Sequence, residues 1–144
     1  MTISNKPGAK QMDFMHIFLS FNGRLRRLHF WIGVIILWVV EVIIMTVTVG
    51  PAMQAAAAGG GGGVGPLGLI GYLLLLVLTW PALAIQVKRW HDRDKSGWWV
   101  LIAFIPIIGA IWVLIECGIL DGTPGPNRFG PSPKGVSGPA SIAT

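Results

Sequence analysis

The stretch KRWHDRDKSGWW (residues 88–99) holds four basic residues, two aspartates, a histidine and three tryptophans in twelve positions. Long apolar runs lie on both sides of it. Membrane proteins place short charged segments flanked by tryptophan at the boundary between water and lipid. The stretch therefore predicts a connector between two membrane-spanning helices.

The composition supports a membrane location. Of the 144 residues, 53% are hydrophobic and only 12% are charged. That is too apolar for an ordinary soluble domain, and the chain is too short to bury so much apolar surface in one core. Between Trp31 and Val87, Glu41 is the only Asp, Glu, Lys, Arg or His. Lipid is the natural solvent for such segments.

Three apolar runs are long enough to cross a bilayer, over residues 30–49, 66–87 and 98–120. At 1.5 Å per residue they span about 30–35 Å, the thickness of a hydrocarbon core. Pro81 and Pro106 interrupt the second and third runs. The fold class predicted is an all-α membrane protein with three transmembrane helices, a short basic cytoplasmic connector and an irregular Gly/Pro-rich C-terminal tail.

The remaining segments divide the chain into three parts. Residues 1–29 form a cytoplasmic lead, in which FMHIFLSF (14–21) is either a loose lead-in or a helix lying in the membrane interface. Residues 30–134 form the membrane domain, with a flexible Ala/Gly linker over 50–65 that contains AAAAGGGGG. Residues 135–144 are expected to be a disordered tail.

The basic residues predict the orientation. Five Lys and Arg precede the first span, none lies in 50–65, four lie in 88–97 and two in the tail. Because loops rich in Lys and Arg stay in the cytoplasm, we expect the N-terminus and the connector inside and the linker outside. Three spans then place the tail outside, which Arg128 and Lys134 oppose.

Three motifs resemble one family. They are FNGRLRR (21–27) followed by Phe30-Trp31, then KRWHD (88–92) with SGWW (96–99), and finally GTPG (122–125) with NRFG (127–130). In this order they resemble the bacterial inner-membrane proteins of the domain of unknown function 805 family. The resemblance covers roughly residues 14–134 and implies a small multi-span protein of the cytoplasmic membrane, without implying any chemistry. The chain departs from the pattern in its Ala/Gly linker and at Lys88-Arg89, where an Arg-Arg pair is commoner.

The cytoplasmic face is the first candidate site. We expect the arginines before the first span to pair with the connector aspartates, and the positive excess to contact anionic lipid head groups. The predicted ion-pair and lipid site comprises Arg24, Arg26, Arg27, Arg89, His91, Asp92, Arg93 and Asp94. Adjacent cations disfavour a metal or catalytic site at His91 and Asp92, and a nucleic-acid module would need a folded basic face. The expected interface anchors are Trp31, Trp90, Trp98 and Trp99.

Glu41 is the second candidate. It lies about 16 Å along the first span from Phe30, near the bilayer centre, where an acid is costly. We expect a protonated Glu41 that bonds to Thr79 or to the Val77 carbonyl, a structural role that we favour over proton or ion relay. Glu116 is expected near the opposite interface, in reach of water.

No residue set indicates a reaction, cofactor or metal. The function predicted is a non-enzymatic inner-membrane module that contacts anionic lipid or a protein partner, which includes a second copy of the chain, through its basic face. The alternative is a small transporter or channel subunit. Few polar residues are available to line a path: Thr46, Thr48, Thr79, Gln86 and Glu41.

Overall fold

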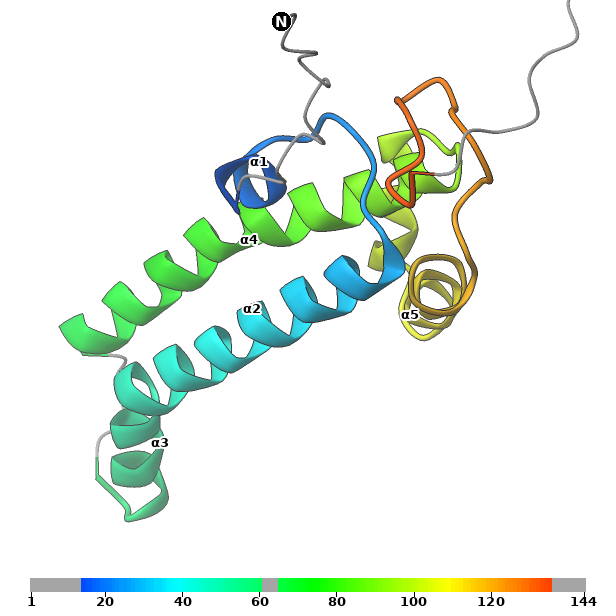
Figure 1. Cartoon of the computed structure of the whole chain (residues 1–144). Coiled ribbons are helices and arrows are strands. Elements are labelled where there is room, and N and C mark those ends of the chain that lie inside the picture. The colour runs from blue at the N-terminus through cyan, green and yellow to red at the C-terminus, as the bar shows by residue number, and fades with distance from the viewer. Residues whose placement is uncertain (1–13, 61–64, 136–144) are drawn as a thin grey trace, which may run out of the picture.

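The computed structural model describes residues 14–60 and 65–135, and its regular elements are helices (Figure 1). The predicted disordered tail after residue 135 and the polar lead before residue 14 lie outside the described residues. The elements are α1 (Phe14–Leu19), α2 (Arg27–Thr48), α3 (Gly50–Ala57), α4 (Pro66–Asp92), the 3-10 helix η1 (Gly97–Phe104), α5 (Ile108–Val113) and the π-helical η2 (Leu114–Ile119).

Helices α2 and α4 lie side by side and form the long axis of the molecule (Figure 1). Their 22 and 27 residues make both helices long and apolar enough to cross a membrane. Only 17% and 22% of their most apolar windows are buried inside the protein. Exposed apolar surface on this scale is unfavourable in water and suits lipid. The predicted first span lies in α2 except for its last residue, Val49, which caps the helix, and the predicted second span falls within α4, which continues through Pro81.

The segment after α2 is more regular than the sequence analysis predicted. We expected a flexible linker over 50–65, but α3 occupies Gly50–Ala57 at the far end of the molecule (Figure 1). Pro51 lies in the first turn of α3, where its missing N–H costs no helical hydrogen bond. The change from alanines to glycines at Gly59 then ends the regular structure, since Gly59 adopts a φ of +79°.

The prediction of one helix over 98–120 is wrong. Helix η1 ends at Phe104, Ile105 is extended, and Ile107 has a φ of +63°, an outlier for a β-branched residue. The chain then reverses, and α5 packs on η1. We call residues 97–119 the helical hairpin.

Pro106 and Gly109 explain the reversal. Proline restricts the residue before it to extended backbone, so the helix ends ahead of Pro106. A Cβ atom at Gly109 would lie 1.9 Å from the Ile102 carbonyl oxygen. The two arms of the hairpin therefore approach as closely as they do because residue 109 has no side chain.

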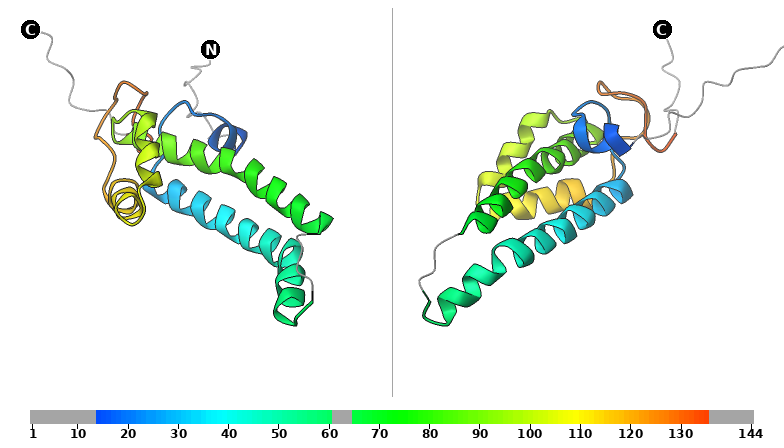
Figure 2. Two further views of the ribbon diagram at one scale, coloured as in Figure 1. Left: turned by 180° about the vertical axis from the view of Figure 1, so that it is seen from behind. Right: turned by 90° about the vertical axis from the view of Figure 1, so that its left-hand side faces the viewer.

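The hairpin brings the tail to the wrong side for the predicted topology. The hairpin and residues 120–135 lie where α2 begins and α4 ends, at the opposite end from α3 (Figures 1 and 2). The Thr123 amide donates to the Asp92 carbonyl at 2.8 Å. The tail and the basic connector thus share one face, which contradicts the expectation of a tail on the other side of the membrane.

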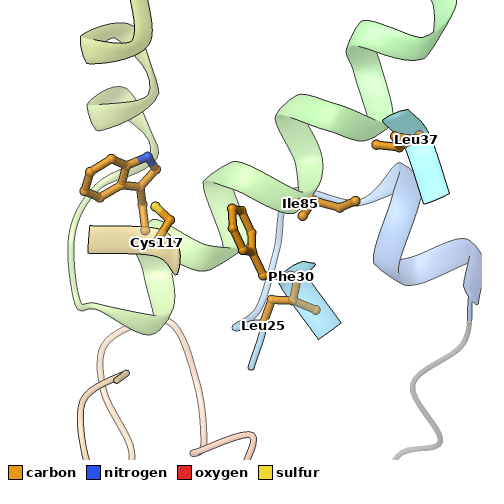
Figure 3. Close-up of a cluster of buried hydrophobic side chains, with 6 residues drawn as sticks. Leu25, Phe30, Leu37, Ile85 and Cys117 are labelled. Carbon is orange, nitrogen blue, oxygen red and sulfur yellow. The ribbon is translucent and has the colours of Figure 1, made fainter. Parts of the chain in front are cut away.

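The buried core is small and lies near this same end. It consists of Leu25, Phe30, Leu37, Ile85, Trp90 and Cys117, five of which are labelled in Figure 3. Leu25 precedes α2, and the others come from the first half of α2, the last two turns of α4 and the returning arm of the hairpin. The core therefore joins the three apolar segments where the charged residues gather.

Candidate functional site

The charged residues collect at one end of the molecule. Every Asp, Glu, Lys and Arg among the described residues lies there, except Glu41. We call this end, residues 22–27, 88–97 and 114–134, the polar cap. It contains nine Lys and Arg against four Asp and Glu. The three motifs that were far apart in the sequence all contribute to it.

Asp92, at the last position of α4, is held by two arginines. Nε of Arg24 donates to its Oδ1 at 3.0 Å, and Nη1 of Arg89, one helical turn earlier, donates to its Oδ2. The exposed fractions of the Arg24, Asp92 and Arg89 side chains are 2%, 4% and 0%. Charge-assisted hydrogen bonds in a desolvated setting are strong, and removal of one partner leaves an uncompensated charge.

Arg24 also fixes the tail to this pair. Its Nη2 donates to the Thr123 carbonyl at 2.7 Å, and its Nη1 donates to the Gly125 carbonyl at 2.6 Å. The tail comes close because residue 122 is glycine, since a Cβ atom there would lie 2.0 Å from Oδ2 of Asp92. Asn127 completes the attachment by donating to the His91 carbonyl at 2.9 Å. The irregular tail segment is thus a specific part of the site.

The end of the hairpin is capped by side chains from the two long helices. The last carbonyls of a helix have no intrahelical donor, and those that are buried away from water need a partner. Arg89 donates to the carbonyls of Cys117, at 2.7 Å, and Leu120. Trp31 donates to the Gly118 carbonyl at 3.1 Å, and Arg27 donates to the Ile119 carbonyl at 2.7 Å. Four successive carbonyls therefore have donors from α2 and α4.

Glu116 lies in the polar cap rather than near the opposite interface, so its predicted position is wrong. The hairpin returns it to Arg93, at 3.1 Å, and Lys95, at 2.7 Å. The Lys95 ammonium also lies 4.9–5.9 Å from three indole rings, those of Trp90, Trp99 and Trp112. Cation–π contacts and the carboxylate together hold the connector against the hairpin.

The outer ion pairs are exposed. Asp94 pairs with Arg128 at 3.2 Å, not with an arginine of the first motif. Asp121 contacts Lys134 at 3.1 Å and Arg27 at 3.7 Å. The hydrogen bond from Lys134 and the positive charge of Arg27 lower the pKa of the Asp121 carboxyl below its ordinary value.

Arg26 is the one predicted arginine whose guanidinium has no hydrogen bond or ion pair with the described residues. His91 is occupied structurally: its ring stacks on Phe129 with centroids 3.9 Å apart, and its Nδ1 lies 3.3 Å from the Gly23 carbonyl. Within 14–60 and 65–135, no three His, Cys, Asp or Glu side chains gather as a metal ion would require.

The four expected tryptophan anchors differ in exposure. Trp98 is 78% exposed and Trp99 is 42% exposed, as an interfacial residue can be. Trp31 is 37% exposed, and its indole N–H also donates a hydrogen bond to the Gly118 carbonyl of the hairpin. Trp90 is fully buried in the core, so its assignment as an interface anchor is wrong. Its place in α4 turns it toward Cys117 and Leu25 instead of outward.

Glu41 lacks the partners that were expected. The Thr79 hydroxyl donates to the Leu76 carbonyl at 2.6 Å, and no hydrogen bond joins Glu41 to the part of the chain that the structure describes. Glu41 instead lines a cavity between α2, α4 and the hairpin.

Sequence reasoning missed several residues of the cap. Lys88 donates to the His16 and Ile17 carbonyls and so holds the end of α1 on α4. Thr123, Asn127 and Phe129 lie in a motif that the sequence analysis quoted without giving it a structural role. Its Gly- and Pro-rich composition indicates irregular backbone, but carries no sign of which surface that backbone covers.

Two long apolar helices with largely exposed side chains, a shorter apolar hairpin and one charged end are typical of a small helical membrane protein. Residues 18–131 match the family described as "Protein of unknown function (DUF805)", and the chain belongs to that family. The polar cap is thus the part of the fold that the three family-like motifs build.

Relatives with curated names agree with this membership. Inner membrane protein YhaH of Escherichia coli (strain K12) is 38% identical over 117 residues, which cover 81% of this chain and 89% of YhaH. Inner membrane protein YhaI of the same strain is 33% identical, with 81% of this chain and 88% of YhaI covered. Uncharacterized protein YiiR is 29% identical over 87% of this chain and 93% of its own length. A comparison with solved structures finds no significant match.

Proposed function

We propose that the protein is a non-enzymatic component of the bacterial inner membrane whose polar cap lies at the cytoplasmic surface and binds anionic lipid head groups. Two of its relatives carry the name inner membrane protein. In the proposed topology α2 and α4 cross the bilayer, and the hairpin enters and leaves from the cytoplasmic face. This replaces the third crossing inferred from the sequence.

Charge distribution supports this orientation. With the tail beside the connector, Arg128 and Lys134 no longer oppose the positive-inside rule, and the described Lys and Arg all belong to one face. The linker face carries none. A two-crossing chain therefore satisfies the rule better than a three-crossing chain.

The excess of cations in the cap carries the lipid proposal. The guanidinium groups of Arg24 and Arg89 are buried in internal hydrogen bonds. We therefore no longer include these two arginines among the lipid-binding residues that the sequence analysis predicted. Arg26 has no ion pair with a described residue, and Arg27, Arg128 and Lys134 have side chains that are 45–61% exposed. Each basic residue near an anionic membrane surface contributes about 1 kcal/mol of attraction.

The transporter alternative finds less support in the helices. The hydroxyls of Thr46, Thr48 and Thr79 donate to carbonyls of their own helices. They are therefore satisfied locally and do not mark successive depths of a polar path.

Lipid titration of the full-length protein in neutral detergent tests the proposal. Phosphatidylglycerol should raise the unfolding temperature, because a ligand that binds only the folded state stabilises it, whereas phosphatidylcholine should not. Arg26→Gln/Arg128→Gln should weaken the response by about 1 kcal/mol per residue. Asp94→Asn/Asp121→Asn, which increases the positive excess, should strengthen it. An equal response to both lipids, or an unchanged response in both variants, would contradict the proposal.

A further inference from the structure

A cavity of about 470 Å³ lies beside the buried core, and none of the charged residues of the polar cap lines it. Its walls come from α2, α4, η1 and the returning arm of the hairpin, and include Phe30, Leu37 and Ile85, which Figure 3 shows. This volume falls within the range of small-molecule binding pockets, about 300–1,000 Å³. Trp38 and Leu114, which line it, are also exposed, so the cavity opens onto the outer apolar surface.

Two polar side chains interrupt the apolar wall. Glu41 contributes a carboxyl from α2, and Gln86 contributes an amide from α4. Neither has a hydrogen bond or ion pair with the described residues. Every described Lys and Arg lies in the polar cap, and the nearest in sequence on α2, Arg27, is 14 residues or about 21 Å along the helix from Glu41. The part of the chain that the structure describes thus provides no Lys or Arg for this carboxyl.

The wall also presents aromatic rings. Phe30, Trp31 and Trp38 lie on the same helix as Glu41 and line the same cavity. The faces of aromatic rings, above all of tryptophan, attract cations. A carboxylate inside a membrane-spanning segment is costly without a partner. Trp38 lies three residues before Glu41, whereas Phe30 and Trp31 lie about 15–17 Å along the helix from it. A ligand that is apolar over most of its surface and carries one positive charge would place the charge between Glu41 and Trp38 and its apolar body against Phe30 and Trp31.

We propose that this cavity binds a lipophilic monocation, with Glu41 as its counter-ion, the Trp38 ring beside its charge and the Phe30 and Trp31 rings against its apolar body. A neutral ligand of the same shape would leave the carboxyl without a partner, and an anion would be repelled by it. The site does not depend on lipid binding at the polar cap, because the two share no charged residue.

The test uses two ions of nearly equal size and opposite charge. Tetraphenylphosphonium and tetraphenylborate are titrated into the full-length protein in non-ionic detergent, with calorimetry and tryptophan fluorescence as readouts. Saturable one-to-one binding of the cation is expected, with binding of the anion about tenfold weaker or more. Glu41→Gln should weaken cation binding by about tenfold or more, while Glu41→Asp, which keeps the charge, should retain most of it.

Two controls keep the result interpretable. The phosphatidylglycerol response of Glu41→Gln should equal that of the wild type, which separates this site from the lipid-binding face and shows that the variant is folded. If Glu41→Gln does not fold, two results still test the proposal. They are the retained cation binding of Glu41→Asp and the weaker binding of tetraphenylborate by the wild type. The absence of saturable cation binding by the wild type, equal binding of the two ions, or undiminished binding by a folded Glu41→Gln would overturn the proposal.

Discussion

Arg24 and Asp92 lie 68 residues apart in the chain, yet Nε of Arg24 donates to Oδ1 of Asp92 at 3.0 Å and both side chains are almost fully buried. The pair ties the segment that enters α2 to the last residue of α4. Through the other donors of Arg24, it ties both to the tail at Thr123 and Gly125. One ion pair thus joins three parts of the polar cap that are far apart in the sequence.

The first prediction concerns this pair. Asp92→Asn keeps the size of the side chain but leaves the buried guanidinium groups of Arg24 and Arg89 without a counter-charge. The loss should be about 3–5 kcal/mol of unfolding free energy, the usual cost of breaking a buried pair. Asp94→Asn is the matched control, because the exposed Asp94–Arg128 pair should contribute no more than about 1 kcal/mol. Unfolding in detergent measures both, and comparable losses would refute the central role of Asp92.

The second prediction uses Cys117, the single cysteine, as a reporter of hairpin opening. Cys117 is fully buried, and Arg89 donates to its carbonyl. The planar guanidinium of Arg89 donates at once to the Cys117 and Leu120 carbonyls and to Asp92. The ammonium group of a lysine at position 89 cannot reproduce this geometry. Loss of a buried hydrogen bond to a charged group costs about 1.5–3 kcal/mol, so Arg89→Lys should label with N-ethylmaleimide roughly tenfold faster or more.

Arg128→Lys, on the exposed side of the cap, serves as the control for that experiment. Its labelling rate should match that of the wild type. Equally slow labelling of Arg89→Lys would mean that the hairpin stays closed without the arginine fork.

The third prediction concerns the close approach inside the hairpin. Gly109→Ala places a methyl group against the Ile102 carbonyl, where there is no room, and should cost about 1–3 kcal/mol through overpacking. Gly65→Ala should be tolerated, since none of the described atoms lies within 4 Å of a Cβ atom at that position. A fully stable Gly109→Ala protein would show that the two arms do not pack as described.

The fourth prediction is the sidedness of the hairpin. Single cysteines at Ala57, Ser96 and Ser132 in a Cys117→Ser background are exposed to an impermeant maleimide in spheroplasts. Only Ala57→Cys should react, and the other two should react after the membrane is permeabilised. Reaction of Ser132→Cys in intact spheroplasts, with Ser96→Cys protected, would mean that residues 98–120 cross the bilayer after all.

The sequence predicted the two long helices well, because length and apolar composition are local properties. It also placed the first motif and the connector on one face. It failed at residues 98–120, where the apolar run has the right length for a third crossing. A proline is tolerated within many membrane helices, so Pro106 could not by itself reveal the reversal.

What decides the hairpin is not local. The carbonyls of residues 117–120 find their donors on Arg27, Trp31 and Arg89, which belong to other helices. Glu116 was misplaced for the same reason, since its position follows from the direction of the returning arm. Trp90 was read as an anchor from its position beside charged residues, whereas its burial depends on how the hairpin packs against α4.

The side-chain capping of the hairpin has a consequence for biogenesis. Until α2 and α4 are paired, the carbonyls at the end of the hairpin lack these donors, and carbonyls that are buried without a partner are costly. We therefore expect the two long helices to insert and associate first, with residues 97–119 entering the bilayer last. Chains stopped during synthesis before residue 97 should already resist extraction by carbonate, whereas a fragment that begins at residue 97 should be extracted. If that fragment integrated into the membrane on its own, the hairpin would not require α2 and α4 to be paired first.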